Sequence, residues 1–398
     1  MTRAGRYVTQ LEGYQAFEPE PLPPTPELRI DLSISRELDR ASRLLGRLDG
    51  VSTQMPNPDL FVAMYVRQEA VLSSQIEGTQ ASLTDVLQFE EEAEAAEDRL
   101  LDVAEVSNYV KAMNQGLERV KELPLSKRLI REIHETLLAG TRGGQLTPGE
   151  FRCTQNWIGP AGCTLKTARF VPPPPHVMQR ALDNLEAFLH DDQYPPLIVA
   201  ALSHAQFETI HPFLDGNGRI GRLLVTFLLC ERAVLQKPLL YLSAYLKRNR
   251  LEYYDRLQAV RDDGDWEGWV SFFLRGVAEV AEDASETATK IMRLQSEIHA
   301  MLVNEGKAAA NLIRALELLF IKPVLTAATV KNELALSAPS AYGVIERLRE
   351  LDVIRETTGG QRNRRYEFTR YLELFESANE VAPTGPRDRT AAASSGEE

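Results

Sequence analysis

The strongest constraint on the fold is a segment of twelve residues, His211-Pro-Phe-Leu-Asp-Gly-Asn-Gly-Arg-Ile-Gly-Arg222. Pro212 ends the helix expected before it, which puts His211 at the C-terminal edge of that helix. Gly216 and Gly218 flank Asn217, so the backbone can turn tightly and expose its amides. A second helix is expected to begin just after this turn. The segment therefore predicts two helices joined by an anion site suited to phosphates.

Charged side chains of the same segment predict that this site binds a polyphosphate and a metal. Arg219 and Arg222 lie three residues apart, hence on one face of the first turn of the helix. Two guanidinium groups beside exposed amides indicate several phosphates. Asp215 offers the carboxylate oxygen that Mg²⁺ takes together with phosphate oxygens. His211 is then placed to act as a general base.

Composition narrows the class of protein. The chain has 398 residues, of which 43% are hydrophobic and 26% charged, and this predicts two or three domains with buried cores. A net charge of −12 disfavours binding of bulk nucleic acid. Three cysteines without a CxxC pair fit neither a disulfide framework nor a zinc site. No signal region and no apolar run of spanning length are visible. We expect a cytoplasmic protein with free thiols and no membrane partner.

Helical periodicity dominates the first 300 residues. The predicted helices cover residues 34–48, 58–74, 101–117, 126–138, 176–189 and 196–210, and one more begins just after Gly218. The proline-rich residues 17–27 are expected to be extended. Residues 140–175 are rich in Gly, Pro and Thr, with β-type runs around Trp157 and Phe170, which indicates a hairpin flap. The fold class is thus mainly α, a helical bundle with a β-hairpin flap.

A second unit is expected from about residue 300. Three predicted helices, over residues 309–319, 328–334 and 337–351, precede a hairpin around Thr358-Gly359-Gly360. Helices followed by a hairpin are the order of a winged helix-turn-helix. The last residues have no core-forming composition and are expected to be disordered.

The segment from His211 to Arg222 resembles the Fic family, whose signature is HxFx(D/E)GNGRxxR, and every fixed position is present. The likeness extends to SHAQFETI upstream, to FRCTQNWIG and RFVPPP in the flap, and to LYLSAYLKRNRLEYYDRL downstream. It covers roughly residues 30–370. The chain looks like the bacterial subclass with a C-terminal winged helix. The resemblance implies a protein adenylyltransferase, a nucleotidyltransferase that moves AMP from ATP onto a hydroxyl of a target protein and of itself.

The resemblance also implies a role for each residue. His211 would take the proton of the target hydroxyl, and Asp215 would hold Mg²⁺ at the α- and β-phosphates. The flap, Gln155 to Pro172, would clamp the target as an added strand. The residues expected to bind the nucleotide are Gly216, Asn217, Gly218, Arg219, Ile220, Gly221, Arg222, Arg248, Tyr253 and Tyr254.

A second motif, Ser73-Ser-Gln-Ile-Glu77-Gly78, resembles the inhibitory motif of the family, (S/T)xxxE(G/N). The spacing puts Ser73 and Glu77 on one face of a helix, one turn apart. The resemblance names Arg222 as the partner of Glu77, which would withhold this guanidinium from the γ-phosphate. An ordinary helix end capped by Gly78 is the alternative.

The expected domains are an N-terminal helical region with the inhibitory helix (1–110), a Fic catalytic core (111–290), a winged helix domain (300–372) and a disordered tail (380–398).

Several alternatives stay open at this point. The chain could be a DNA-binding regulator that only senses a nucleotide, or a transferase of another nucleotide or of phosphate. The winged helix could bind DNA through residues 337–351 and Arg362, Arg364 and Arg365, or it could bind protein. The oligomeric state, with a homodimer among the choices, is not fixed. His204 is expected to pack or to form hydrogen bonds rather than to bind a metal, and Trp266 and Trp269 are expected in the core.

Overall fold

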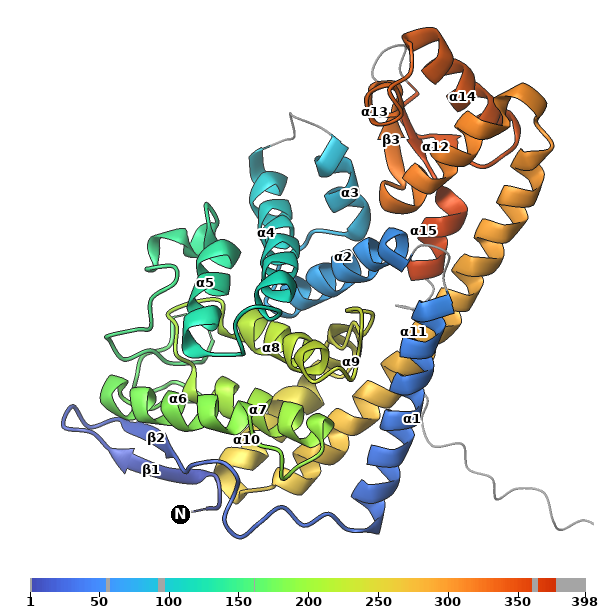
Figure 1. The fold of residues 1–398 in the computed structure, drawn as a ribbon. Helices are drawn as coiled ribbons and strands as arrows, with labels where there is room; N and C mark the ends of the chain where they lie inside the picture. The colour runs from blue at the N-terminus through green and yellow to red at the C-terminus, as the bar shows by residue number, and fades with distance from the viewer. Residues whose placement is uncertain (1, 55–57, 92–96, 161, 360–363, 377–398) are drawn as a thin grey trace, which may run out of the picture.

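The structure, a computed structural model, describes residues 2–54, 58–91, 97–160, 162–359 and 364–376. It is mainly helical, as predicted, and it has two small antiparallel sheets (Figure 1). None of the helices within these ranges is both long and apolar enough to cross a bilayer. The predicted tail and Arg362 lie outside the described residues.

The N-terminus forms a hairpin that the sequence analysis missed. Strands β1 (Gly5–Thr9) and β2 (Gln15–Pro19) pair antiparallel, with Tyr7 opposite Phe17. Phe17 also donates its backbone N–H to Val171 of the flap, at 2.9 Å. Of the residues 17–27 that were predicted to be extended, residues 17–19 lie in β2, and residues 20–27 form no regular helix or strand. The hairpin gains its stability from the flap, a contact between segments far apart in the sequence.

The helices of the first 145 residues form one part of the bundle. These are α1 (Leu32–Gln54), α2 (Pro58–Ile76), α3 (Leu83–Glu91), α4 (Glu97–Arg119), α5 (Lys127–Leu138) and the short 3₁₀ helix η1 (Arg142–Gln145). Helix α1 packs along α11 (Trp266–Val303), a helix of 38 residues. Because α11 runs on past residue 300, it connects the bundle to the C-terminal unit as one continuous rod (Figure 1).

The centre of the bundle consists of α7 and α8, which carry the segment from His211 to Arg222. The helices of this part are α6 (Pro175–Leu189), α7 (Pro196–Ile210), α8 (Asn217–Glu231), α9 (Ser243–Arg248) and α10 (Arg250–Asp263). Every residue of α7 from Leu197 to Ile210 is buried. Trp266 and Trp269 are buried beside it, as predicted. A helix surrounded on all sides by the core gives the turn after it a fixed position.

The flap between α5 and α6 is largely irregular. Its two predicted β-type runs meet in one antiparallel bridge, between Ile158 and Phe170, rather than in a longer ladder. Several prolines, including Pro172, Pro173 and Pro174, lack the N–H that a ladder needs, which keeps the pairing short.

The C-terminal unit combines helices with a small sheet at the far end of α11 from the β1–β2 hairpin (Figure 1). Its elements are η2 (Gly306–Ala308), α12 (Ala309–Ile321), β3 (Val324–Thr326), α13 (Ala327–Glu333), α14 (Ala338–Glu350), β4 (Arg355–Glu356), β5 (Arg365–Glu367) and α15 (Thr369–Glu376). The sheet order is β3-β5-β4, all antiparallel. The three predicted helices are present, and β3 and α15 were not foreseen. The winged helix assignment stays a prediction.

Candidate functional site

His211 caps the C-terminus of α7 in a left-handed conformation, with φ 48° and ψ 61°. Such a backbone is uncommon for a residue other than glycine and persists only where neighbours hold it. Here the carbonyl of His211 accepts hydrogen bonds from Arg152 Nε (2.9 Å) and Asn156 Nδ2 (3.1 Å). Both donors come from the flap. The flap therefore fixes the backbone from which the His211 ring projects.

The imidazole of His211 is held neutral. Burial, and then the positive charges of Arg261 and Arg152, lower its pKa to about 3. At neutral pH the ring thus carries an unprotonated nitrogen, as a general base requires.

The turn after His211 is closed by its own side chains. Asn217 Oδ1 accepts from the N–H of Phe213 (2.8 Å), and Asn217 Nδ2 donates to the carbonyl of Phe213 (2.9 Å). Gly216 has φ 76°, which favours glycine at this position. The Asn217 side chain is therefore engaged inside the turn.

His134 on α5 supports the same turn and was missed by the sequence analysis. Its Nδ1 accepts from the N–H of Gly149 (2.9 Å), so Nε2 carries the proton and donates to the carbonyl of Asp215 (3.0 Å). Its ring stacks on Phe213 with centroids 3.7 Å apart. Burial lowers its pKa to about 4. A single histidine in a helix gives no sequence signal for such a contact.

Arg219 has unsatisfied hydrogen-bond donors. The residue is 5% exposed, and its Nε and Nη1 form no hydrogen bond among the described residues. The nearest carboxylate oxygens, Asp215 Oδ2 and Glu105 Oε2, each lie 3.7 Å from a guanidinium nitrogen. Buried donors without partners are costly, and a phosphate group would satisfy them.

Asp215 is the only predicted metal ligand, and its side chain is 42% exposed. No cluster of three or more His, Cys, Asp or Glu suited to a metal occurs in the part of the chain that the structure describes. A lone accessible carboxylate fits Mg²⁺, which completes its shell with phosphate oxygens and water, and does not fit a metal held by protein alone.

Arg222, one turn after Arg219, binds the end of α2 through Nε and Nη2. Its Nε donates to Ser73 Oγ (2.7 Å), and its Nη2 donates to the Ser73 carbonyl (3.1 Å) and to Glu77 Oε1 (2.7 Å). Burial disfavours the charge of Arg222, but the acidic groups around it, Glu77 first among them, together outweigh burial and raise its pKa. Partial burial also disfavours the charge of Glu77, but Arg222 and Arg219 together outweigh it and lower the pKa of this carboxyl.

Gly218 makes room for this pair. A Cβ at position 218 would overlap Glu77 Oε1 and lie 3.0 Å from Arg222 Nη1. The absence of a side chain therefore lets Glu77 reach the first turn of α8. Gly78, which follows Glu77, has φ 105° and is exposed. The chain thus leaves α2 immediately after placing the carboxylate.

The remaining predicted nucleotide ligands lie around this centre with partners of their own. Arg248 pairs with Glu279 at 3.2 Å. Tyr253 is buried and its hydroxyl donates to His204 Nε2 (2.9 Å). Tyr254 is half-buried, with Arg250 5.8 Å from its ring centroid.

Ile220 and Gly221, the last two predicted ligands, and His204 lie where α7 and α8 pack. Ile220 is buried, and Gly221 lets α7 and α8 approach closely. His204 donates from Nδ1 to the carbonyl of Gly221 (3.0 Å), which confirms its predicted structural role. The three cysteines are free thiols, as predicted.

Family models match both halves of this site. Residues 35–118 match the model described as "Fic/DOC family N-terminal", and residues 124–229 match "Fic/DOC family". This chain carries a Fic domain. The contact of Glu77 with Arg222 therefore joins the Fic N-terminal region to the Fic domain.

Curated relatives carry a matching description. A probable protein adenylyltransferase of Aquifex aeolicus is 26% identical over 206 residues, covering 51% of this chain and 57% of the relative. The protein adenylyltransferase Fic of Aedes aegypti is 30% identical over 217 residues, covering 52% and 38%. The chain thus matches between about a third and three fifths of the length of these relatives.

The architecture is shared with a solved structure. A Fic family protein from Desulfovibrio desulfuricans superposes with a TM-score of 0.57 and 21% identity, covering 86% of this chain and 97% of that one. The likeness reaches beyond the Fic domain and supports the fold of most of the chain.

Proposed function

We propose that this Fic protein transfers AMP from ATP to a hydroxyl side chain of target proteins and of itself, and that Glu77 restrains the reaction. The observation that carries the proposal is the turn from His211 to Arg222. It combines a neutral histidine with the unsatisfied donors of Arg219 and with a second, buried arginine. The curated relatives named protein adenylyltransferase support the choice of reaction.

The chemistry follows from the residues in place. His211 accepts the proton of the target hydroxyl, whose oxygen attacks the α-phosphorus of ATP in line. The new O–P bond forms as the bond to the β-phosphate oxygen breaks, and pyrophosphate leaves. Arg219 binds the phosphate chain, and Arg222 binds its γ end once Glu77 has left. Asp215 would hold Mg²⁺, which supplies charge neutralisation at the phosphates.

Restraint follows from the geometry of Arg222. With Ser73 and Glu77 bound, Nε and Nη2 of this guanidinium are engaged, and the carboxylate places like charge where a γ-phosphate would bind. ATP would then bind with its phosphates displaced from the attack geometry, which lowers the rate without abolishing binding. The flap and the residues Tyr253 and Tyr254 are proposed to receive the target backbone and the adenine.

A donor experiment tests the reaction. The Glu77→Gly variant is incubated with a protein target mixture, Mg²⁺ and ATP labelled at either the α- or the γ-phosphate, with α-labelled GTP, CTP and UTP in parallel. We expect protein labelling from α-labelled ATP alone. Labelling from γ-labelled ATP would establish phosphotransfer instead, and labelling from another nucleotide would change the donor.

The alternative of a DNA-binding regulator is not favoured by the C-terminal unit. The cations on α14 pair with carboxylates, Arg347 with Glu305 and Glu350, and Arg349 with Glu346. Paired cations offer little to a phosphate backbone. A salt-sensitive shift of a DNA fragment by the intact chain would establish DNA binding, and sedimentation would establish whether it is a homodimer.

A further inference from the structure

Five residues on and just after α2 recur at intervals of four: Phe61, Tyr65, Glu69, Ser73 and Glu77. Residues at this spacing form one continuous ridge along a helix, inclined to its axis. The ridge ends at the contact with Arg222 that we propose to restrain the reaction. The contacts of the other four residues therefore affect how firmly Glu77 is held.

The first two members contact the C-terminal unit and α11. Phe61 packs edge-on against Phe320 of α12, with ring centroids 5.2 Å apart. Tyr65 packs in the same way against Phe375 of α15, at 5.5 Å. The Tyr65 hydroxyl also donates to the carbonyl of Ala284, at 3.0 Å. These side chains are buried, so this half of α2 is packed against the C-terminal unit.

Glu69, the middle member, ties the ridge to the Fic core. It is 3% exposed and accepts from the N–H of Ser243 (3.0 Å), from the Ser243 hydroxyl and from the Tyr109 hydroxyl (3.2 Å). The ridge thus runs without interruption from the C-terminal unit, through a buried carboxylate, to Arg222.

A second connection runs through neighbouring helices. Arg67 on α2 donates to the carbonyl of Ile321, at 3.4 Å. At the end of α3, Glu91 accepts from the hydroxyl of Thr329 in the C-terminal unit. The helices of the Fic N-terminal region therefore contact the C-terminal unit at more than one point.

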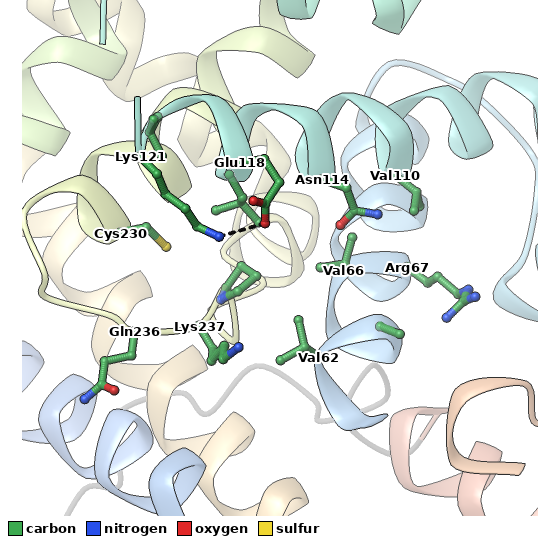
Figure 2. A pocket seen from close by; sticks show the side chains of 14 residues that line it. Val62, Val66, Arg67, Val110, Asn114, Glu118, Lys121, Cys230, Gln236 and Lys237 are labelled. Carbon is green, nitrogen blue, oxygen red and sulfur yellow. Dashed lines mark hydrogen bonds and ion pairs between the residues drawn. The ribbon is translucent and has the colours of Figure 1, made fainter. Parts of the chain in front are cut away.

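A cavity of about 450 Å³ lies beside α2 and is lined by Val62, Val66 and Arg67 of this helix. Figure 2 shows Val62 and Val66 of α2 facing it, with Val110 of α4 and Lys237 on other walls. A helix side that faces a cavity lacks the packing that would hold it in one place. Helix α2 therefore has room to shift, and its contacts with the C-terminal unit matter more to its position.

We propose that the C-terminal unit, residues 309–376, holds α2 in the position from which Glu77 engages Arg222. The inference rests on the proposed restraint by Glu77. Phe320, Phe375 and Tyr65 act as positioning residues, because none of them touches the reacting groups. A partner protein that bound the C-terminal unit and loosened its contact with α2 would raise the rate of AMP transfer by shifting the population towards a released Glu77.

Mild substitutions in this contact test the proposal. Phe375→Leu and Phe320→Leu are made in the wild type and in Glu77→Gly, with Tyr342→Ala as the control, since Tyr342 is 57% exposed on α14. We expect the first two to raise the initial rate of AMP incorporation about threefold to tenfold in the wild type, the range that contacting residues give. We expect no rise in Glu77→Gly, and none from Tyr342→Ala in either background. Unchanged rates in the wild type, or equal rises in both backgrounds, would overturn the proposal.

Amide hydrogen exchange tests the positioning role independently of the transferase activity. If Glu77→Gly shows no AMP transfer, the proposed function fails, and amide exchange of residues 70–78 still decides the positioning role. Faster exchange in Phe375→Leu and Phe320→Leu than in Tyr342→Ala supports it, and equal exchange contradicts it. Near-ultraviolet circular dichroism of each variant confirms that its core is packed before the rates are compared.

Discussion

The two sides of the site are held very differently. On the His211 side, the backbone carbonyl accepts two hydrogen bonds from the flap, Asn217 closes the turn, and His134 supports it from α5. On the other side, Glu77 is the first residue after the end of α2. Its side chain is 37% exposed, and the next residue is an exposed glycine. The comparison indicates that the turn around His211 is preformed, whereas the contact of Glu77 with Arg222 can be released.

The two partners of this ion pair also differ in burial. Because Glu77 is partly exposed, solvent screens its side of the pair. Arg222, in contrast, is 3% exposed, so it cannot lose Glu77 without another acceptor. A γ-phosphate is such an acceptor. Productive binding of ATP is therefore expected to favour the release of Glu77.

The largest effect is expected at the fixed side, for His211→Ala in the Glu77→Gly background. Removing the base should lower AMP incorporation by about 10²–10⁴-fold, the usual contribution of acid–base catalysis, while ATP still binds to the arginines. Incorporation and calorimetric ATP binding are measured in parallel. Near-normal incorporation would remove His211 from the mechanism.

Asp215→Ala, or EDTA added to Glu77→Gly, is expected to act almost as strongly. The phosphates would lose the charge neutralisation that a metal supplies, a loss of about a hundredfold or more. Initial rates are compared at several Mg²⁺ concentrations. Transfer that is indifferent to both EDTA and the Asp215 substitution would contradict the assignment.

A smaller effect is expected for Asn156→Ala, which removes the flap contacts to His211 and Phe213. We expect kcat to fall about tenfold, because a displaced base loses alignment, with KM for ATP little changed. Cys153→Ala, an exposed flap residue, is the control. An unchanged kcat would show that the turn holds His211 without the flap.

The smallest effect concerns Glu208, buried on α7 of the fixed side. Burial raises its pKa to about 7, with Arg222 opposing this. The pKa of this carboxyl group is higher in the folded than in the unfolded protein. Its contribution to stability is therefore fully present below the unfolded pKa and is lost as the pH rises towards 7. Relative to Glu208→Gln, the Tm of the wild type should therefore fall by a few degrees, roughly, between pH 5 and pH 8. A difference in Tm that stays constant across this range would contradict the assignment.

Local patterns predicted most helices and the catalytic turn because both depend on neighbours in sequence. Pro212 and the glycines fix the turn wherever it occurs, and the spacing of Ser73 and Glu77 places both on one ridge. The N-terminal hairpin was missed because its second strand is stabilised by Val171, about 150 residues away. His134, Arg152 and Asn156 were missed for the same reason. Their roles depend on tertiary contacts with the backbone of the turn, which no periodicity records.

The most direct test of the central claim compares the initial rate of AMP incorporation for the wild type, Glu77→Gly and Glu77→Gly combined with His211→Ala. Because the lost contact is a charge-assisted hydrogen bond to a buried arginine, Glu77→Gly should exceed the wild type by about tenfold to a hundredfold. The double variant should fall about 10²–10⁴-fold below Glu77→Gly. A folded Glu77→Gly protein with a rate at or below that of the wild type would mean that Glu77 does not restrain the site.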